Sequence, residues 1–468
     1  MPHQTVHVPP DLEFLAGFER IREQFDVPES FPDEVLAAAQ TTVPEDHERI
    51  DRRDLDLVAI DPPGSADLDQ AYAAEPRGEG YRVFYAIADV APFVPPGGPV
   101  DLEARERGVT RYHPDGRTPL YPAAISEGAA SLLAGKDRPA LLWTVDLGGD
   151  GRLETAEIRR ALVRVRRQLT YRQAQDEIDA GDGLGLLREI GERRIALEAE
   201  RGGVHLNLPD QEVVPTGDGR YAVVYERTLP VERWNAQVSL LTGMAAADLM
   251  IEAGVGILRT LPDPEPGTVD TLRRTADALG IEWAEDTGYA ERIRRLHPDT
   301  AAEAALLGQA VRLLRGAGYE AFDGSPSDDA RHSAVAAHYA HVTAPLRRLA
   351  DRFANEVLLA HCAGEAPPAW ATEALDGLPR IMNRTRSQAG NLERAYVDYV
   401  EAMALRSRVG ERFRAVVTDV DGDRARVQLR DPAVIARLPA GNLGLGEEVE
   451  VLLDEVDPDA RRVHFSIA

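Results

Sequence analysis

The order of strand-like and helix-like segments along the chain is the feature that most limits its fold. Runs rich in β-branched and aromatic residues come first, at 56–60, 81–88, 141–147 and 153–165. Segments with the apolar spacing of helices follow, at 171–180, 187–201, 232–253, 268–280, 300–316, 346–360 and 380–408. Strands grouped before helices indicate an α+β domain rather than a repeating βαβ sheet. The glycines at 148–151 predict a hairpin turn between two of the strands.

The two ends of the chain differ from this central region. Residues 1–50 carry two short helical patterns, at 11–25 and 33–40, which predict a small helix-turn-helix-like module or a helical appendage packed on the main domain. Residues 409–468 alternate apolar and polar side chains in four short stretches, which predicts a small β-barrel of the oligonucleotide-binding (OB) type. We therefore expect three domains, at 1–50, 51–408 and 409–468.

Charge and composition restrict the partners of such a chain. Its 468 residues include 53 basic and 79 acidic side chains, a net charge of -26, which argues against indiscriminate binding of nucleic acid by the outer surface. A single cysteine, Cys362, allows no intrachain disulfide and no cysteine metal cluster. The sequence has no apolar run of the ~18 residues that a membrane span needs, and it does not open like a signal peptide. We expect a monomeric cytoplasmic protein that does not contact membranes.

The most informative segment is rich in aspartate. An apolar strand leads to Asp61 and a Pro-Pro-Gly turn, after which the chain returns with Asp67 and Asp69. If 67–69 is extended, its alternation places both carboxylates on one face. Converging carboxylates need a cation between them, and oxygen ligands favour Mg²⁺ or Mn²⁺, metals that serve phosphodiester hydrolysis. The alternative is a solvated acidic loop in which aspartate is a turn residue.

A second segment, 338–351, combines a turn, a helix start and two arginines. Thr343 can cap a helix in which Pro345 occupies the first turn, and the free N–H groups there attract phosphate. Arg347 and Arg348 add two guanidinium forks beside that anion site. The alternative is that one of the two arginines forms a structural pair with Asp351.

Together these two segments resemble the ribonuclease II (RNB) family of 3′→5′ exoribonucleases, and the resemblance spans about 52–408. The aspartate segment is similar to the family's D-x5-D-x-D-D pattern, and 338–351 is similar to its HYAHxTSPIRRYxD signature. Three further segments look like family motifs: Ala86–Val90 (IADV), the Arg111-Tyr112-His-Pro stretch, and Leu392-Glu393-Arg394. The resemblance implies an RNB catalytic domain at 51–408 and an S1-like RNA-binding domain at 409–468.

The resemblance also implies roles for individual residues. Asp61 and Asp67 would hold Mg²⁺ (or Mn²⁺), and Asp69 would share the metal and orient or deprotonate the attacking water. Arg347 would grip the phosphate at the scissile bond, with Arg348 beside it. Tyr112 would stack near the RNA 3′ end, and Glu393 would lie close to the terminal nucleotide. The implied activity releases 5′-nucleoside monophosphates from single-stranded RNA, without a small-molecule organic cofactor.

Two features leave alternatives open. Gln70 stands at the fourth acidic position of the aspartate pattern, where its amide oxygen is a weaker, uncharged metal ligand. The number of metals is then open, and so are an inactive or weak RNA-binding protein of the same fold and a metal phosphohydrolase of small nucleotides. The second feature is an arginine-rich strand in which Arg164 and Arg166 alternate with valines; it predicts an RNA-channel wall or, alternatively, a set of ion pairs.

Overall fold

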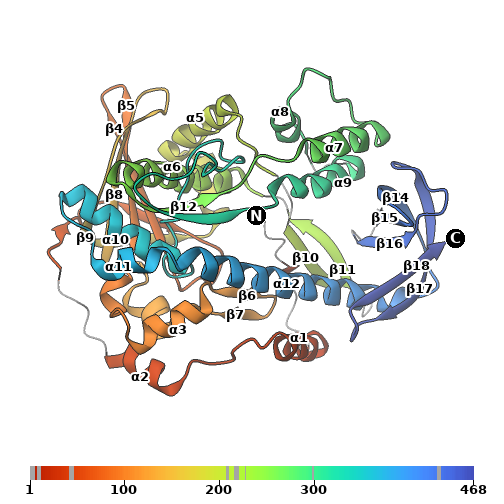
Figure 1. The fold of residues 1–468 in the computed structure, drawn as a ribbon, viewed down its shortest axis with the longest axis horizontal. Coiled ribbons are helices and arrows are strands. Elements are labelled where there is room, and N and C mark those ends of the chain that lie inside the picture. The colour runs from red at the N-terminus through yellow and green to blue at the C-terminus, as the bar shows by residue number, and fades with distance from the viewer. Residues whose placement is uncertain are drawn as a thin grey trace.

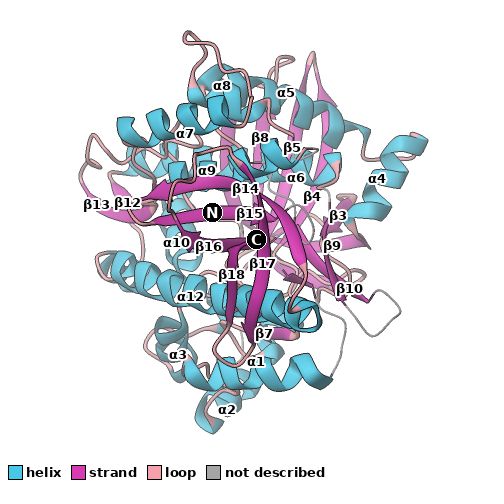
Figure 2. Cartoon of the chain, turned by 90° about the vertical axis from the view of Figure 1, so that its right-hand side faces the viewer, coloured by secondary structure: helices cyan, strands magenta, loops and turns pink. Residues whose placement is uncertain are grey.

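The computed structural model describes residues 6–7, 12–41, 47–206, 210–215, 221–226, 228–297, 300–429 and 434–468. It has a large α+β body and a smaller β-barrel at the C-terminal end (Figure 1), which confirms the predicted fold class. The long helix α12 (Leu378–Leu405) runs from the body toward the barrel (Figures 1 and 2). Residues 1–5 and 8–11, on which the expected absence of a signal peptide depends, lie outside the described residues.

The centre of the body is a six-stranded sheet in the order β2–β9–β3–β4–β5–β8. Its strands are β2 (Ile50–Asp51), β3 (Leu57–Ile60), β4 (Gln70–Arg77), β5 (Gly80–Ala88), β8 (Asp137–Leu147) and β9 (Leu153–Leu169). The first part of β9 pairs antiparallel with β8, and its last part pairs parallel with β3. Because β9 has 17 residues and pairs on both sides, five of the strands close into a ring. The predicted turn at 148–151 joins β8 to β9.

Helices surround this ring, and the predicted helical segments are all present. With α12, the helices that correspond to them are α4 (Tyr171–Ala180), α5 (Gly185–Arg201), α6 (Pro230–Ala253), α7 (Pro266–Ala278), α9 (Ala301–Ala310) and α10 (Leu349–Ala363). Three further helices were not predicted: α3 (Pro99–Arg107), α8 (Tyr289–Arg294) and α11 (Ala369–Leu375). The segment predicted at 300–316 is α9 followed by a 3₁₀ turn, Val311–Leu314. Helices α6 and α10 pack on β9, which buries the outer side of the ring there. None of the helices that the structure describes is both long and apolar enough to cross a bilayer.

Three small sheets complete the body. They are the hairpin β6 (Arg111–His113) and β7 (Gly116–Thr118), the pair β12 (Val255–Thr260) and β13 (Gly318–Asp323), and the trio β1 (Val6–His7), β10 (Asp210–Pro215) and β11 (Tyr221–Glu226). Short turns of 3₁₀ helix lie at Ala91–Phe93 and Arg406–Arg408, and a π-helix spans Ala124–Ala129. The β6–β7 hairpin lies under α12 in Figure 1, and this contact brings it to the site described below.

The C-terminal barrel has five strands rather than the four that the alternation predicted. They are β14 (Arg412–Asp421), β15 (Arg424–Leu429), β16 (Ile435–Pro439), β17 (Glu448–Asp457) and β18 (Arg462–Ile467), in the order β16–β15–β14–β17–β18. The additional strand is β16, a short edge strand. Phe413 and Phe465 meet edge to face in the barrel core, 5.9 Å apart. Both rings are buried, so neither is presented to a base on the barrel surface.

The first two helices pack on the body in different places. On α1 (Leu12–Gln24), Phe18 contacts Tyr396 and Tyr399 of α12, with ring centroids 5.5 and 5.6 Å away. Val35 and Ala39 of α2 (Asp33–Thr41) belong instead to the main core of the body. This is the arrangement of two helices packed on a larger domain, each buried by a different partner.

Candidate active site

The aspartate loop between β3 and β4 is fixed at both ends by hydrogen bonds. The Asp61 N–H donates to the carbonyl of Leu169 on β9 at 3.1 Å, which places Asp61 at the end of the ring strand β3. The following turn contains Gly64 with φ +79°, a left-handed conformation that glycine adopts without strain. The Ser131 hydroxyl then accepts from Leu68 N and donates to Ala66 O, at 2.9 and 2.7 Å. The loop therefore returns to β4 along a defined path.

Asp69 lies at the end of this path and meets the second segment. Its Oδ1 accepts a hydrogen bond from the backbone N–H of Leu346 at 2.8 Å, and its Oδ2 accepts from Nε of Arg347 at 3.2 Å. The Asp69 side chain is only 6% exposed, whereas that of Arg347 is 43% exposed. The fold thus brings together two segments 277 residues apart in the sequence, with the carboxylate inside and the guanidinium open to solvent.

The helix start predicted at Thr343 was wrong. Helix α10 begins at Leu349, and the preceding residues form a turn in which Arg347 N and Arg348 N donate to the carbonyl of Ala344. The backbone N–H groups expected to attract phosphate are occupied, because Ala344 N donates to Asp351 and Leu346 N donates to Asp69. Carboxylates of the protein itself therefore occupy two of these N–H groups.

Arg348 is held by the adjacent helix. Its Nε and Nη2 contact both carboxylate oxygens of Asp351 at 2.8 to 3.2 Å, and the Asp351 side chain is fully buried. This is the structural pair that the sequence left open as an alternative. Of the two neighbouring arginines, only Arg347 faces the aspartate loop.

Burial is the main cause of raised pKa values at two aspartates of this loop. Burial, and after it the negative charge of Asp69, raise the pKa of the Asp61 carboxyl to about 7, although Arg347 opposes this shift. Burial also raises the pKa of Asp69 to about 7, against the stabilising charge of Arg347 and the Leu346 N–H group. Two neighbouring carboxyls that titrate near neutrality mark this loop as a site rather than a solvated surface turn.

Arg117, on β7, is a residue of this site that the sequence analysis missed. Its Nη1 lies 2.5 Å from Asp67 Oδ1, and its Nη2 lies 2.8 Å from Glu127 Oε1 in the π-helix. The strand register places Arg117 directly opposite Tyr112, whose side chain is 51% exposed. The Asp115-Gly116 pair between them is a hairpin signal, and it could have indicated that Arg117 folds back beside Tyr112.

Gln70 is fully engaged by the protein. Its Nε2 donates to the carbonyl of Thr343 at 2.7 Å, and its Oε1 accepts from the Tyr85 hydroxyl at 2.5 Å. The Tyr85 oxygen also lies 2.8 Å from Ser239 Oγ on α6. The amide oxygen predicted to face a metal thus faces a phenol.

The remaining predicted site residues are Arg164, Arg166 and Glu393, and the described contacts of the two arginines are with other parts of the protein. Arg164 pairs with Asp137 at 2.6 Å, and Arg166 donates to the carbonyl of Arg53 at 2.8 Å, which is the ion-pair alternative for this strand. Neither has a described contact with the aspartate loop. Glu393 lies on the stretch of α12 between Gln388 and Tyr396, two residues that hydrogen-bond to the β6 strand carrying Tyr112.

The donor atoms around the loop suit a hard cation, but their side chains do not converge as a set of ligands. Within the described ranges, no three acidic, histidine or cysteine side chains gather as a metal site. Asp67 and Asp69 turn toward Arg117 and Arg347, whereas no hydrogen-bonding partner of the Asp61 carboxylate is described. A mostly unpartnered carboxylate beside a second one, with only oxygen donors nearby, fits Mg²⁺ or Mn²⁺ in chemistry.

Comparisons with protein families place both parts of the chain. The RNB domain matches residues 49–364, and the RNase II-type exonuclease C-terminal S1 domain matches residues 411–468. Ribonuclease R of Escherichia coli (strain K12) is 26% identical over 505 residues, which cover 94% of this chain and 61% of that protein. Ribonuclease R of Aquifex aeolicus (strain VF5) is 25% identical over 511 residues, covering 98% and 71%. The chain therefore spans about three fifths of the length of the Escherichia coli relative.

Solved structures agree in fold at low identity. The apo form of Mycoplasma genitalium RNase R has a TM-score of 0.86 at 18% identity, covering 98% of this chain and 78% of that one. Yeast Ssd1, described as a pseudonuclease, has a TM-score of 0.70 at 16% identity, covering 95% and 59%. A protein named as an RNase and one described as a pseudonuclease therefore share this architecture, so the fold alone does not decide whether a chain is active.

Proposed function

Because the chain belongs to the RNB domain family of RNase R- and RNase II-like exoribonucleases, we propose that it is a metal-dependent 3′→5′ exoribonuclease. It would hydrolyse single-stranded RNA and release 5′-nucleoside monophosphates. The observation that carries this proposal is the contact of Asp69 with Leu346 N and Arg347, which unites the two segments that resemble the family's motifs. In such a site the buried carboxylate can orient a water molecule while the solvent-exposed guanidinium beside it binds a phosphate.

Hydrolysis of a phosphodiester needs an oriented water and a group that neutralises the charge growing on the phosphate. Asp69 would orient the water and accept its proton as a general base. Arg347 would hold the phosphate. Within the described part of the chain only its Nε is hydrogen-bonded, so the outer nitrogens of its fork are open to a ligand.

Asp61 and Asp67 would hold the metal together with Asp69, since their oxygens are of the type that Mg²⁺ binds. The family generally depends on Mg²⁺. When bound, the ion would lower the pKa of the attacking water and stabilise the leaving oxygen. If Asp67 bound the ion, Arg117 would lose its ion pair with Asp67 and would still be paired with Glu127.

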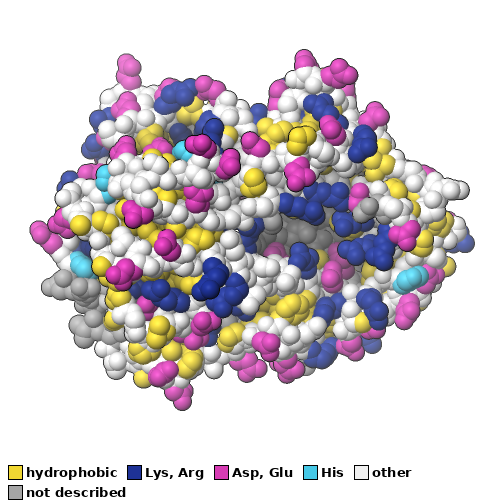
Figure 3. All heavy atoms as spheres, in the orientation of Figure 1, with side chains coloured by type: hydrophobic (Ala, Val, Ile, Leu, Met, Phe, Trp, Pro, Cys, Tyr) yellow, Lys and Arg dark blue, Asp and Glu magenta, His cyan; other side chains and the backbone are white. Residues whose placement is uncertain are grey.

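RNA would reach this site past the exposed ring of Tyr112, on which a terminal base can stack. Glu393 would lie near the same nucleotide, because α12 packs against the Tyr112 hairpin. Arg164, Arg166 and Arg348 are left outside the proposed contacts, since each already has a partner in the protein. Figure 3 shows a hollow beside the barrel with basic side chains around its rim, a surface suited to guiding the strand.

The test is an exonuclease assay with four substrates. We expect Mg²⁺-dependent release of mononucleotides from 5′-labelled single-stranded RNA, and little reaction with 3′-blocked RNA or with single-stranded DNA. Free nucleotides should be inert, which separates this activity from that of a small-nucleotide phosphohydrolase. Equal cleavage of RNA and DNA, or cleavage of the blocked strand, would contradict the proposal.

The second candidate is an RNA-binding protein without activity. The likeness to the pseudonuclease Ssd1 and the presence of Gln70 in the aspartate motif favour it. The same assay separates the two candidates, because an inactive protein would retain filter binding of RNA and release no nucleotide at any Mg²⁺ concentration.

A further inference from the structure

The amide group of Gln70 links its own strand to two other segments, and one of its partners links it to a helix. It begins β4, its nitrogen bonds to Thr343, and its oxygen bonds to Tyr85 of the neighbouring strand β5. The Tyr85 hydroxyl in turn contacts Ser239 of α6. Thr343 and Tyr85 are 4% and 1% exposed, so solvent has little access to replace these hydrogen bonds.

The donor and the acceptor of each hydrogen bond in this series follow from the last group, the carbonyl of Thr343, which can only accept. A backbone carbonyl can only accept, so the amide nitrogen of Gln70 must face Thr343 and the amide oxygen must face Tyr85. Tyr85 has one proton and gives it to Gln70, and Ser239 therefore donates to Tyr85. In this series of hydrogen bonds each group donates to the next, from Ser239 to Tyr85, from Tyr85 to Gln70, and from Gln70 to the carbonyl of Thr343.

This series of hydrogen bonds ends at Thr343, in the same segment whose Leu346 and Arg347 donate hydrogen bonds to Asp69. Gln70 fixes the carbonyl of Thr343, and the neighbouring Asp69 fixes the N–H of Leu346 and the side chain of Arg347. Two consecutive residues of one strand edge thus clamp the same turn at two points. The turn is also held by Ala344 N, which donates to Asp351, and by Thr110 N, which donates to the carbonyl of Arg347, so the Gln70 bond adds a further contact on the side of the aspartate loop.

We propose that Gln70 is a positioning residue, which acts through Thr343 to keep Leu346 N and Arg347 in contact with Asp69, and that it is not a metal ligand. A glutamate of the same length would place an acceptor against the acceptor oxygen of Thr343. The aspartate of the family pattern is one methylene shorter and has no proton to donate when ionised, so the amide is suited to this contact in a way that neither acid is. The catalytic part of the inference rests on the proposed function, and the structural part does not.

The experiment compares three single variants of the full chain. Gln70→Met keeps the size of the side chain and removes both hydrogen bonds, and Tyr85→Phe removes only the bond to the amide oxygen. The matched control is Gln168→Met, because the Gln168 amide also donates to a backbone carbonyl of the aspartate loop, that of Ser65 at 2.9 Å, but on the exposed side. Three quantities are measured: hydrogen exchange of the peptide that contains 343–348, Mn²⁺ affinity by electron paramagnetic resonance, and kcat with KM on a short RNA.

For Gln70→Met we expect exchange in 343–348 to become about 10-fold faster, as loss of one buried hydrogen bond implies. Tyr85→Phe should show a smaller increase, and Gln168→Met none. The affinity for Mn²⁺ should stay within about twofold of wild type, and kcat should fall about 10- to 100-fold at unchanged KM.

Two results would overturn the inference. Unchanged exchange in 343–348 for Gln70→Met would show that the amide does not hold the turn. A large loss of Mn²⁺ affinity with normal exchange would make Gln70 a ligand instead. If the wild-type protein cleaves no RNA, the proposed function fails, while exchange and metal affinity still decide the role of Gln70.

Discussion

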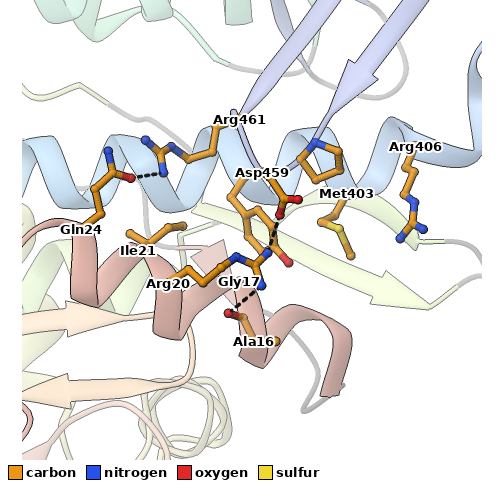
Figure 4. A pocket seen from close by; sticks show the side chains of 11 residues that line it. Ala16, Gly17, Arg20, Ile21, Gln24, Met403, Arg406, Asp459 and Arg461 are labelled. Carbon is orange, nitrogen blue, oxygen red and sulfur yellow. Dashed lines mark hydrogen bonds and ion pairs between the residues drawn. The ribbon is translucent and has the colours of Figure 1, made fainter.

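The protein joins distant parts of its chain at two junctions that are built differently. At the first, Asp69 is buried against Leu346 and Arg347, deep in the body. At the second, helix α1 meets the barrel through Arg20 and Asp459, whose side chains are 53% and 82% exposed. Figure 4 shows this second junction, where the two charged groups reach across an open pocket between α1, α12 and the turn after β17.

The two junctions differ in how far water can replace the contacts of their charged groups. A surface ion pair competes with solvent and contributes about 0–1 kcal/mol, so the α1–barrel junction can open at little cost. A buried charge that loses its partner is left unsolvated, and the cost is several kcal/mol. We conclude that the first junction can hold atoms at fixed distances, whereas the second holds α1 against the barrel only loosely.

The largest expected effect comes from Asp69→Asn at the buried junction. The amide keeps the size of the side chain but cannot accept a proton or balance the charge of Arg347, so the single-turnover rate should fall by ~10²–10⁴. RNA affinity in a filter-binding assay should stay near that of wild type, since it depends on arginines and stacking. A variant that cleaves at the normal rate would remove Asp69 from the proposed chemistry.

A comparison of the adjacent arginines should give the next largest effect. Arg347→Lys keeps the charge but loses the planar fork, and we expect kcat to drop about 10²-fold while the melting temperature stays nearly constant. Arg348→Lys should do the reverse, because it breaks the two-pronged contact with the buried Asp351 and so lowers stability more than turnover. Equal effects on kcat would mean that both arginines contact the RNA.

The metal-free protein should lose stability as the pH rises through neutrality. A carboxyl whose pKa is raised on folding stabilises the folded state while it is protonated, and this stability is lost between the unfolded pKa near 4 and the folded value of about 7. Between pH 6 and pH 8, Asp61 and Asp69 should each cost about 1 kcal/mol. Denaturant unfolding with a chelator measures this loss, and Asp61→Asn should reduce it; an unchanged pH dependence would speak against a buried Asp61.

Deleting 411–468 sharpens the comparison from the side of the barrel. Among the residues that the structure describes, Leu405 is the only one of the body that belongs to the buried core of the barrel, so the body keeps its own core. Binding of long RNA should weaken, and the slope of log affinity against log salt should fall in magnitude by about 0.7 for each phosphate that the barrel no longer neutralises. Turnover of very short RNA should persist, and a folded truncation that is inactive on short RNA would contradict this separation of tasks.

The smallest effect is expected at the exposed junction. Arg20→Ala should change the free energy of unfolding by less than about 1 kcal/mol and should leave turnover of short RNA unchanged. Gly17→Ala is the contrasting variant, because a methyl group there would lie 2.0 Å from the ring of Tyr399 and push α1 away from α12. If Arg20→Ala is the more damaging of the two, the ion pair and not the apolar contact holds α1.

Sequence patterns were sufficient where the determining contacts are local. The helix at 171–180 was predicted with its bounds because its cap and apolar face lie within ten residues. The family resemblance placed Asp69 near Arg347, a proximity that the spacing alone does not determine. Short elements with little periodicity, such as β16, were missed because tertiary pairing and not pattern makes them strands.

The failures share a physical cause. The helix was predicted to start at Thr343 because free N–H groups need an acceptor, but the acceptor for Leu346 N is Asp69, far away in the sequence. The partners of the Gln70 amide, Thr343 and Tyr85, were not foreseen because they come from other segments, and the assignment of Gln70 as a metal ligand stays a prediction. Arg117 was overlooked because its partner Asp67 lies across a hairpin and a loop. Each error concerns a hydrogen bond whose second partner only the folded ring supplies.

The 277 residues between Asp69 and Leu346 also set the order in which the site appears during protein synthesis. At roughly 5–20 residues per second, a ribosome makes Leu346 about 14 to 55 s after Asp69. Throughout this interval the nascent chain carries the aspartates without Arg347, so the proposed nuclease has no assembled site.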